Sequence, residues 1–530
     1  MHSVANLQNA IADLNHERQK VSDRQAGDRG LGQAGADLRG GQHAADSLRK
    51  HVVTQSPAQK ALEAKETSKA QLLSPAVPST PLAAARDVAQ VCAAPDRNTD
   101  RWGEVLKWGG SNRVESAGDC CKMCAEFVPE EKTDFMECNV WVYCEDQARC
   151  KDNYKSCWLK HLPHPDASRP RSDPLVPWTS GIISPALSGA DLAAEAEGDR
   201  SFHTVITAQG APTHWQSRVG YYWFLKTKRQ CQAAGKCEMG GFTRVLHSGE
   251  PDDLMQEIPT FVAQTLPPEH PDHGYVVLNR PYALLQWIRQ ATIPEKYVLM
   301  SEPDHLWLRP MANLMKGTRP AAFPFFYIEP SKKSYLPIVQ KFTGPITRKE
   351  AEQIAPIGNA PTLMSLDDLT RVFPVWFNLS IAIHNDEQAA KEWGWVQEMY
   401  AFTIASYNAG VRNIGLHPEM AAQPPYDTKL ADFYILHYTY GNDYDLNGTF
   451  TPGRLRWGWA KLAPGDSTSD PTPKNRLPRN LGPPPMGMKN ELVRRLVDAI
   501  NEASGIIPGW DEYAETGVAK ALWDGKTFAS

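Results

Sequence analysis

The stretch Tyr297-Val-Leu-Met-Ser-Glu-Pro-Asp-His305 indicates both the fold class and the chemistry. Its first four residues are apolar, which predicts a buried strand. Glu302 and Asp304 follow, and their i, i+2 spacing places both carboxylates on one side of an extended chain. An acidic pair in this position favours either a divalent-cation site or an ordinary solvated turn or helix cap.

On both sides of this stretch, short apolar runs alternate with longer helical patterns. Residues 202–208 and 242–248 read as strands, and residues 214–230 and 281–291 read as helices. This alternation predicts an α/β domain with a parallel, doubly wound sheet, whose ligands bind beyond the carboxyl ends of the strands. The sequence carries neither a P-loop motif nor a G-x-G-x-x-G after the first strand, so a metal-assisted nucleotide-sugar site is the remaining interpretation.

Three later segments add candidate side chains. Residues 375–383 are predicted to form an apolar strand interrupted by Asn378, and residues 433–438 a strand ending near His437. A strand-terminal histidine could complete a metal shell of two carboxylates and one imidazole, or be an ordinary core residue. Glu398 lies in a predicted amphipathic helix, where it points either at a substrate or into solvent.

The cysteines concentrate in one short segment. Eight of the ten are Cys92, Cys120, Cys121, Cys124, Cys138, Cys144, Cys150 and Cys157. An even, dense set predicts disulfides and an oxidising compartment, whereas zinc would need a second ligand pair that does not follow Cys121-x-x-Cys124 at finger spacing. The segment resembles a PAN/apple domain, a disulfide-stapled module that binds protein or carbohydrate. Two sequons, at Asn378 and Asn447, fit a secretory route.

Composition bounds the remaining possibilities. The 530-residue chain has a net charge of -5, which disfavours nucleic acid as a partner. It contains no apolar run of membrane-span length and no secretory h-region, so we expect a luminal protein whose native anchor lies outside this sequence. The expected organisation is a stem (1–90), a PAN/apple-like module (91–165), a Pro/Ser-rich linker (166–200), a catalytic domain (201–465), and a Pro-rich segment with a C-terminal helix that packs on the catalytic domain (466–530).

Eight sequence blocks carry a closer resemblance. They are GGFTRVLHSG, GYVVLNRPYALLQW, EPDHLWLRP, AAFPFFYI, PIGNAPT, GWVQEMYAF, QPPYD and HYTYGNDYD. Together they resemble the hydroxyproline O-arabinosyltransferase family of plants and green algae. The resemblance implies a GT-A-like glycosyltransferase domain with a Rossmann-like mixed sheet. It also implies transfer of L-arabinofuranose from UDP-β-L-arabinofuranose to the 4-hydroxyl of peptidyl hydroxyproline with retained configuration.

The resemblance also implies roles for individual residues. The manganese ligands would be Glu302, Asp304 and His437, with His305 either touching the ion or fixing the loop. Residues near the donor would be Thr207, Ala208, Arg218, Asn279, Arg280, Gly358, Asn359, Trp376 and Gln423. Catalytic candidates would be Glu398, Asp427 and Asn378.

Two questions stay open at the level of sequence. Retention permits either a double displacement through an enzyme carboxylate or a same-face substitution. The cysteine-rich module is shared with peptidyl-serine α-galactosyltransferases, so that activity is an alternative, as is a non-catalytic glycoprotein-binding role. The expected setting is the secretory pathway, in the Golgi lumen or endoplasmic reticulum, with a type II membrane protein as the native form.

Overall fold

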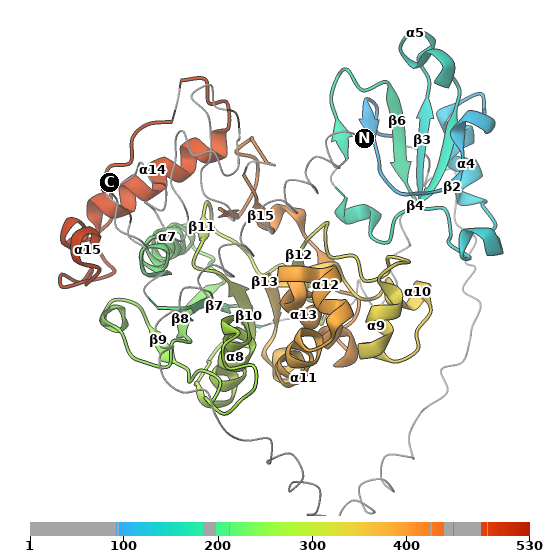
Figure 1. Cartoon of the computed structure of the whole chain (residues 1–530). Helices are drawn as coiled ribbons and strands as arrows, with labels where there is room; N and C mark the ends of the chain where they lie inside the picture. The colour runs from blue at the N-terminus through green and yellow to red at the C-terminus, as the bar shows by residue number, and fades with distance from the viewer. Residues whose placement is uncertain are drawn as a thin grey trace, which may run out of the picture. The chain divides into compact units, whose positions relative to one another are not determined.

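A seven-stranded mixed sheet forms the centre of the larger domain (Figure 1). The structure is a computed structural model that describes residues 92, 95–168, 170–183, 198–210, 213–424, 427–438, 449, 477, 479–484 and 486–529. The sheet order is β14-β12-β13-β10-β7-β8-β9. The strands are β7 (Phe202–Ala208), β8 (Met239–Leu246), β9 (Thr260–Val262), β10 (Tyr297–Ser301), β12 (Ala321–Pro324), β13 (Ile357–Ser365) and β14 (Gly415–Leu416).

The predicted parallel pairing joins β10, β7, β8 and β9, and also β12 and β14. β10, β7, β8 and β9 are mutually parallel, and β10 and β7 lie where the apolar runs predicted them. β13 is antiparallel to both β10 and β12, so the sheet as a whole is mixed rather than parallel. All seven residues of β7 are buried, as expected for a central strand covered on both faces.

Helices cover the two faces of the sheet. The larger domain contains α7 (His214–Ala233), α8 (Asn279–Gln290), α9 (Leu336–Thr343), α10 (Arg348–Ala351), α11 (Leu366–His384), α12 (Glu387–Trp393) and α13 (Gln397–Asn408). Of these, α7 and α8 contact β8, and α11 and α13 contact β13. His203 of β7 packs against Trp287 of α8, with ring centroids 5.9 Å apart. Arg244 of β8 points to the opposite face and bonds Asp252, which His214 of α7 also contacts. Helices α8 and α7 therefore lie on opposite faces of the sheet.

A second, three-stranded sheet creates the site. β11 (His305–Trp307) follows β10 after a three-residue turn and pairs antiparallel with β16 (Ile435–His437), which is parallel to β15 (Ala421–Ala422). The register places His305 opposite His437. This pairing brings a residue more than a hundred positions along the chain to the end of β10.

Residues 375–383 are helical, so the strand predicted there is wrong. They lie within α11, which begins after Ser365, whose hydroxyl accepts the N–H of Asp368. The run looks like a strand because α11 packs against both α8 and α13, and its apolar residues therefore occupy more than one face. Trp376 is fully buried in this helix, whereas Asn378 is exposed.

Two C-terminal helices, α14 (Glu491–Ile506) and α15 (Trp510–Thr516), flank α7 (Figure 1). Trp223 of α7 donates its indole N–H to the carbonyl of Ala499, 3.0 Å away. Arg218 of α7 forms a bidentate ion pair with Glu257, at 2.9 and 2.7 Å, and neither side chain is exposed. The Arg218 guanidinium also lies over the rings of Trp510 and Tyr513. Arg218 is therefore a structural residue, and the predicted phosphate contact is wrong.

Substituting Arg218 with Met is expected to lower the free energy of unfolding by about 3–5 kcal/mol, because Glu257 would keep a buried charge without its partner. Urea unfolding monitored by tryptophan fluorescence measures the loss. The double variant Arg218→Met/Glu257→Leu removes both charges and should recover most of the stability. A loss below about 1 kcal/mol in the single variant would mean that Glu257 is solvated or protonated instead.

The cysteine-rich module is a small four-stranded sheet with one helix against it. Its strands run in the order β2 (Glu104–Lys107), β4 (Cys157–His161), β3 (Val140–Cys144) and β6 (Trp178–Ile182), and α4 (Ala117–Ala125) packs on β3. The short strands β1 (Thr99–Asp100) and β5 (Arg171–Ser172) pair with each other, and α5 (Gln147–Cys150) follows β3.

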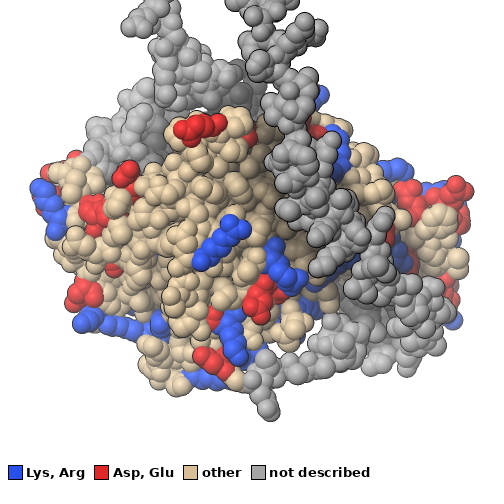
Figure 2. Space-filling view, turned by 90° about the horizontal axis from the view of Figure 1, so that it is seen from below, with Lys and Arg blue, Asp and Glu red and all other residues tan. Residues whose placement is uncertain are grey.

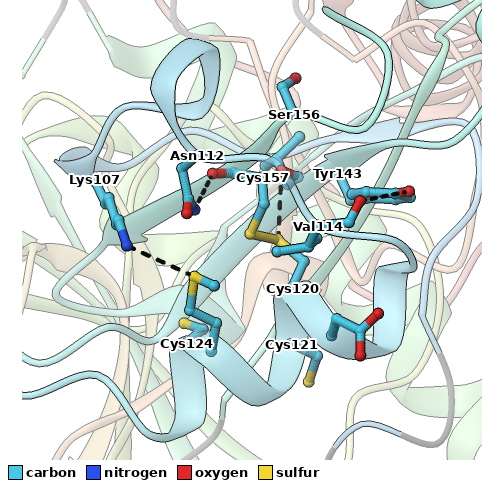
Figure 3. The surroundings of a disulfide bond; sticks show 12 residues. Lys107, Asn112, Val114, Cys120, Cys121, Cys124, Tyr143, Ser156 and Cys157 are labelled. Atoms are coloured by element: carbon cyan, nitrogen blue, oxygen red, sulfur yellow. Dashed lines mark hydrogen bonds between the residues drawn. A yellow bond between two sulfur atoms is a disulfide. The ribbon is translucent and has the colours of Figure 1, made fainter.

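The predicted disulfides are present, and the zinc alternative is excluded because all eight cysteines are paired. The bonds are Cys92–Cys121, Cys120–Cys157, Cys124–Cys138 and Cys144–Cys150, with a further pair, Cys231–Cys237, in the larger domain. Figure 3 shows the Cys120–Cys157 bond joining α4 to β4. Each such bond stabilises a module of this size by about 2–4 kcal/mol.

The face in Figure 2 carries Lys and Arg close to Asp and Glu, without a broad region of one sign. Among the described residues, no helix combines the length and apolar character needed to cross a bilayer. The predicted stem and the sequon at Asn447 lie outside the described residues.

Candidate active site

The predicted metal ligands come together at the carboxyl end of β10. One ligand atom each from Glu302, Asp304, His305 and His437 lies within 4.8 Å of all the others. His437 Nε2 is 3.3 Å from Asp304 Oδ2, and both side chains are buried. Two carboxylates with imidazole nitrogens form a donor set that suits Mn²⁺ or a similar divalent ion.

Arg280 links this cluster to Glu398. Its guanidinium lies 3.2 Å from Glu302 Oε1 and 3.0 Å from Glu398 Oε2. The helix α8 therefore presents Arg280 to two carboxylates at the end of β10, and its predicted contact with a phosphate stays a prediction. Asn279 Oδ1 accepts the N–H of Leu266 at 2.9 Å and closes the preceding loop, and its predicted phosphate contact stays a prediction.

Glu398 is buried, which decides against a solvent-facing carboxylate. Burial raises its pKa to about 7, although the neighbouring Arg280 opposes the rise. Its Oε1 has no hydrogen-bond partner within the described part of the chain. The first turn of α13 thus holds a carboxylate that can change charge near neutral pH, next to the predicted metal ligands.

Trp376 and Gly358 both contact the first turn of α13, which carries Glu398. The Trp376 indole N–H donates to the backbone carbonyl of Glu398 at 3.2 Å. A Cβ on Gly358 would lie 2.7 Å from the Met399 side chain, so glycine gives α13 room to approach β13. Asn359 is buried in the same strand. The predicted catalytic role of Asn378 finds no support, because this side chain faces solvent.

The loop at Gln423 orients His437. The Gln423 side-chain amide lies 3.3 Å from His437 Nδ1. Asp427 Oδ2 accepts the backbone N–H of Gln423 at 2.7 Å, which ties this carboxylate to the loop. Asp427 is therefore a support for Gln423, and Glu398 is the better placed of the two predicted catalytic carboxylates.

Polar atoms without partners mark the ends of the neighbouring strands. Buried atoms that make no hydrogen bond to any described residue include Thr207 Oγ1 at the end of β7 and His247 Nδ1 just after β8. Buried polar atoms are normally paired, so these positions are suited to contact a ligand. Ala208 is fully buried between them, and its carbonyl accepts the N–H of His247 at 2.9 Å.

Sequence reasoning missed His247. Burial and the charge of Arg280 lower its pKa to about 4, so the imidazole is neutral at physiological pH. The signal was present, because His247 directly follows the predicted strand residues Val245 and Leu246, much as Glu302 closely follows residues 297–300. The rule that polar residues after a strand form the site would have selected it.

A second acidic cluster is already neutralised by protein groups. Asp252 accepts hydrogen bonds from Arg244 and from His214, each donor 2.8–3.0 Å from Oδ2. Burial alone would raise the pKa of Asp252, but these two donors hold it well below its usual range. The cluster of His214, Asp252 and Asp253 therefore needs no metal ion to balance its charge.

Models of known protein families match both the larger domain and the cysteine-rich module. The hydroxyproline O-arabinosyltransferase family N-terminal domain matches residues 202–415, and the C-terminal domain of the same family matches residues 434–511. The chain belongs to the hydroxyproline O-arabinosyltransferase family. A PAN domain matches residues 99–160, which confirms the identity suggested for the cysteine-rich module.

Individual members of the family are close relatives of this chain. Hydroxyproline O-arabinosyltransferase 1 of Arabidopsis thaliana is 49% identical over 313 residues, which are 59% of this chain and 81% of the relative. Hydroxyproline O-arabinosyltransferase 2 of the same plant is 46% identical, covering 59% and 83%. Hydroxyproline O-arabinosyltransferase RDN2 of Medicago truncatula is 45% identical, covering 58% and 82%.

Proposed function

We propose that this protein transfers L-arabinofuranose from UDP-β-L-arabinofuranose to the 4-hydroxyl of peptidyl hydroxyproline, with retained configuration and in a divalent-cation-dependent reaction. The relatives named as hydroxyproline O-arabinosyltransferases support the acceptor and the sugar. The observation that carries the chemistry is the assembly of Glu302, Asp304 and His437 at the end of β10, beside Glu398. We assign the larger domain to the GT-A plan on the same observation, because an acidic pair after a central strand is its metal site.

The donor set fits the proposed ion. Glu302 and Asp304 supply anionic oxygens, and His437 supplies an imidazole whose other nitrogen faces Gln423. A bound Mn²⁺ would act as a Lewis acid that neutralises charge on the departing UDP. Thr207 and His247 would contact the nucleotide portion from the ends of β7 and β8, where their buried polar atoms have no partner in the described chain.

Glu398 is the group that we expect to act on the anomeric carbon of the donor sugar. The low-polarity surroundings that raise its pKa also strengthen its interaction with a developing positive charge. Arg280 holds one of its oxygens, and the other oxygen has no partner among the described residues. In a double displacement, Glu398 bonds to the anomeric carbon as the bond to UDP breaks. The hydroxyproline oxygen then bonds to that carbon as the bond to Glu398 breaks, which regenerates the carboxylate, and the hydroxyl proton passes to a phosphate oxygen of the departing UDP.

Five disulfides fit an oxidising compartment, so we place the protein in the lumen of the secretory pathway. The acceptors in that compartment would be hydroxyproline-rich glycoproteins.

The substrate assignment is tested by direct assay. Purified protein is incubated with Mn²⁺, UDP-β-L-arabinofuranose and a hydroxyproline peptide, and with matched peptides that carry proline or serine at the same positions. Mass spectrometry is expected to show one added pentose per event on the hydroxyproline peptide alone. Transfer of a hexose from UDP-galactose to the serine peptide, without pentose transfer, would replace this function with the peptidyl-serine α-galactosyltransferase activity.

A further inference from the structure

Two imidazoles, not one, border the carboxylates of the candidate metal site. His305 and His437 face each other across the β11–β16 pair, with ring centroids 4.6 Å apart, and both are buried. Each offers a nitrogen to the cluster. Whether an imidazole can bind a metal depends on which of its nitrogens carries the proton, and that is set by the partner of the other nitrogen.

The surroundings of His305 place its proton on Nε2. The backbone N–H of Glu302 donates to His305 Nδ1 at 3.2 Å. A backbone N–H can only donate and cannot rotate, so Nδ1 must present its lone pair. The Ser301 hydroxyl lies 2.9 Å from the same nitrogen and can turn to donate as well. A neutral His305 therefore carries N–H at Nε2 and has no lone pair left for a metal ion.

The surroundings of His437 permit the opposite arrangement. Its Nδ1 lies 3.3 Å from Nε2 of the Gln423 side-chain amide. A primary amide presents either its oxygen or its NH₂ group by rotating half a turn. With the oxygen toward His437, Nδ1 keeps the proton and Nε2 presents a lone pair. That Nε2 lies 3.3 Å from Asp304 Oδ2, inside the cluster.

We propose that His437 is the imidazole ligand of the metal site and that His305 is a hydrogen-bond donor beside it. Through Nε2–H, His305 binds the anionic oxygens that collect around the ion, either carboxylate or diphosphate. This inference rests on the proposed metal-dependent function. It assigns different roles to two histidines that are both near enough to the carboxylates to bind the same ion. His305 is thus a positioning residue.

The test counts imidazole nitrogens bound to Mn²⁺. Pulsed electron paramagnetic resonance on the Mn²⁺-loaded protein resolves ¹⁴N coupling from a coordinated imidazole. We expect one coupled imidazole in the unmodified protein and in His305→Gln, and none in His437→Gln, with Mn²⁺ affinity lowered at least about tenfold in the latter. The amide NH₂ of Gln replaces a histidine Nε2–H, so His305→Gln is the conservative variant. Circular dichroism verifies that each variant is folded.

The donor role has its own readout. In calorimetric titration of the Mn²⁺-loaded protein with UDP, His305→Leu should weaken binding about fivefold relative to His305→Gln, because one hydrogen bond is lost. In unmodified protein labelled with ¹⁵N-histidine, the His305 signal should show a protonated Nε2 and an unprotonated Nδ1. This measurement decides the tautomer even where a variant fails to fold.

The outcomes separate this inference from the function on which it rests. Two coupled imidazoles, or loss of the coupling in His305→Gln, would overturn the assignment of His305 while leaving the metal site in place. Failure of the unmodified protein to bind Mn²⁺ at millimolar concentration would overturn the metal site, and the inference with it. An unprotonated Nε2 on His305 would overturn the tautomer.

Discussion

Replacing Asp304 with Asn is expected to lower kcat/KM for arabinosyl transfer at least about 10²-fold, the loss typical of removing one preorganised electrostatic group. Asp304 is buried and lies between β10 and β11, where its carboxylate faces His437. Asn has nearly the same shape, so the fold should persist, but it lacks the negative charge that attracts a divalent ion. Initial rates over a range of Mn²⁺ concentrations, with calorimetric Mn²⁺ binding, measure both effects.

The matched control for this variant is Asp367→Asn, the same chemical change at an exposed position in the first turn of α11. Its activity and Mn²⁺ binding should remain within about twofold of the unmodified protein. Near-normal turnover by Asp304→Asn, or equal losses in both variants, would rule out the metal assignment.

The strand-end residues of the site could be predicted because their signal is local. Apolar residues 297–300 and the acidic pair that follows them stand next to each other in the chain, and strand geometry alone places both carboxylates on one side. His437 likewise ends a short apolar run. What the sequence does not contain is the β11–β16 pairing that brings His437 to Asp304, since this contact spans more than a hundred residues.

Arg218 shows why charge on a helix is a poor guide to function. Its spacing in α7 is compatible with a phosphate contact, with a surface position or with the core. Its actual partners are Glu257, Trp510 and Tyr513, the last two almost 300 residues away. A buried ion pair requires two residues that meet only in the folded protein. The sequence around one of them does not reveal the other.

The error at residues 375–383 has a different origin. A continuous apolar run fits either a buried strand or a helix covered on several faces, and periodicity alone does not separate the two. The deciding signal lies upstream, where Ser365 followed by Asp367 and Asp368 forms a helix start with acidic residues in the first turn. Reading that start would have placed Trp376 in a helix that supports Glu398.

Glu398→Gln is expected to lower kcat about 10²- to 10⁴-fold, the range for loss of a group that acts directly on the reacting centre. Gln keeps the size of the side chain and can still accept a hydrogen bond from Arg280, but it cannot form a stable bond to the anomeric carbon or balance its charge. The matched control is Glu392→Gln, an exposed position on the neighbouring helix α12, which should leave kcat unchanged.

The pH dependence of transfer should identify Glu398 as the group that must be ionised. Burial raises its pKa to about 7, so the carboxyl is mostly protonated below that pH and becomes the active carboxylate above it. We therefore expect kcat/KM of the unmodified protein to rise with pH through about 7, and the residual activity of Glu398→Gln to lack that rise.

Mass spectrometry of enzyme quenched during turnover then distinguishes the two retaining routes. A pentose covalently attached to Glu398 establishes double displacement, whereas unmodified Glu398 together with the same pH profile assigns it to charge stabilisation during same-face substitution. A kcat of Glu398→Gln within about twofold of normal would show that Glu398 does not act on the anomeric carbon. Replacing a buried carboxylate at that carbon with a neutral amide should lower kcat far more than twofold.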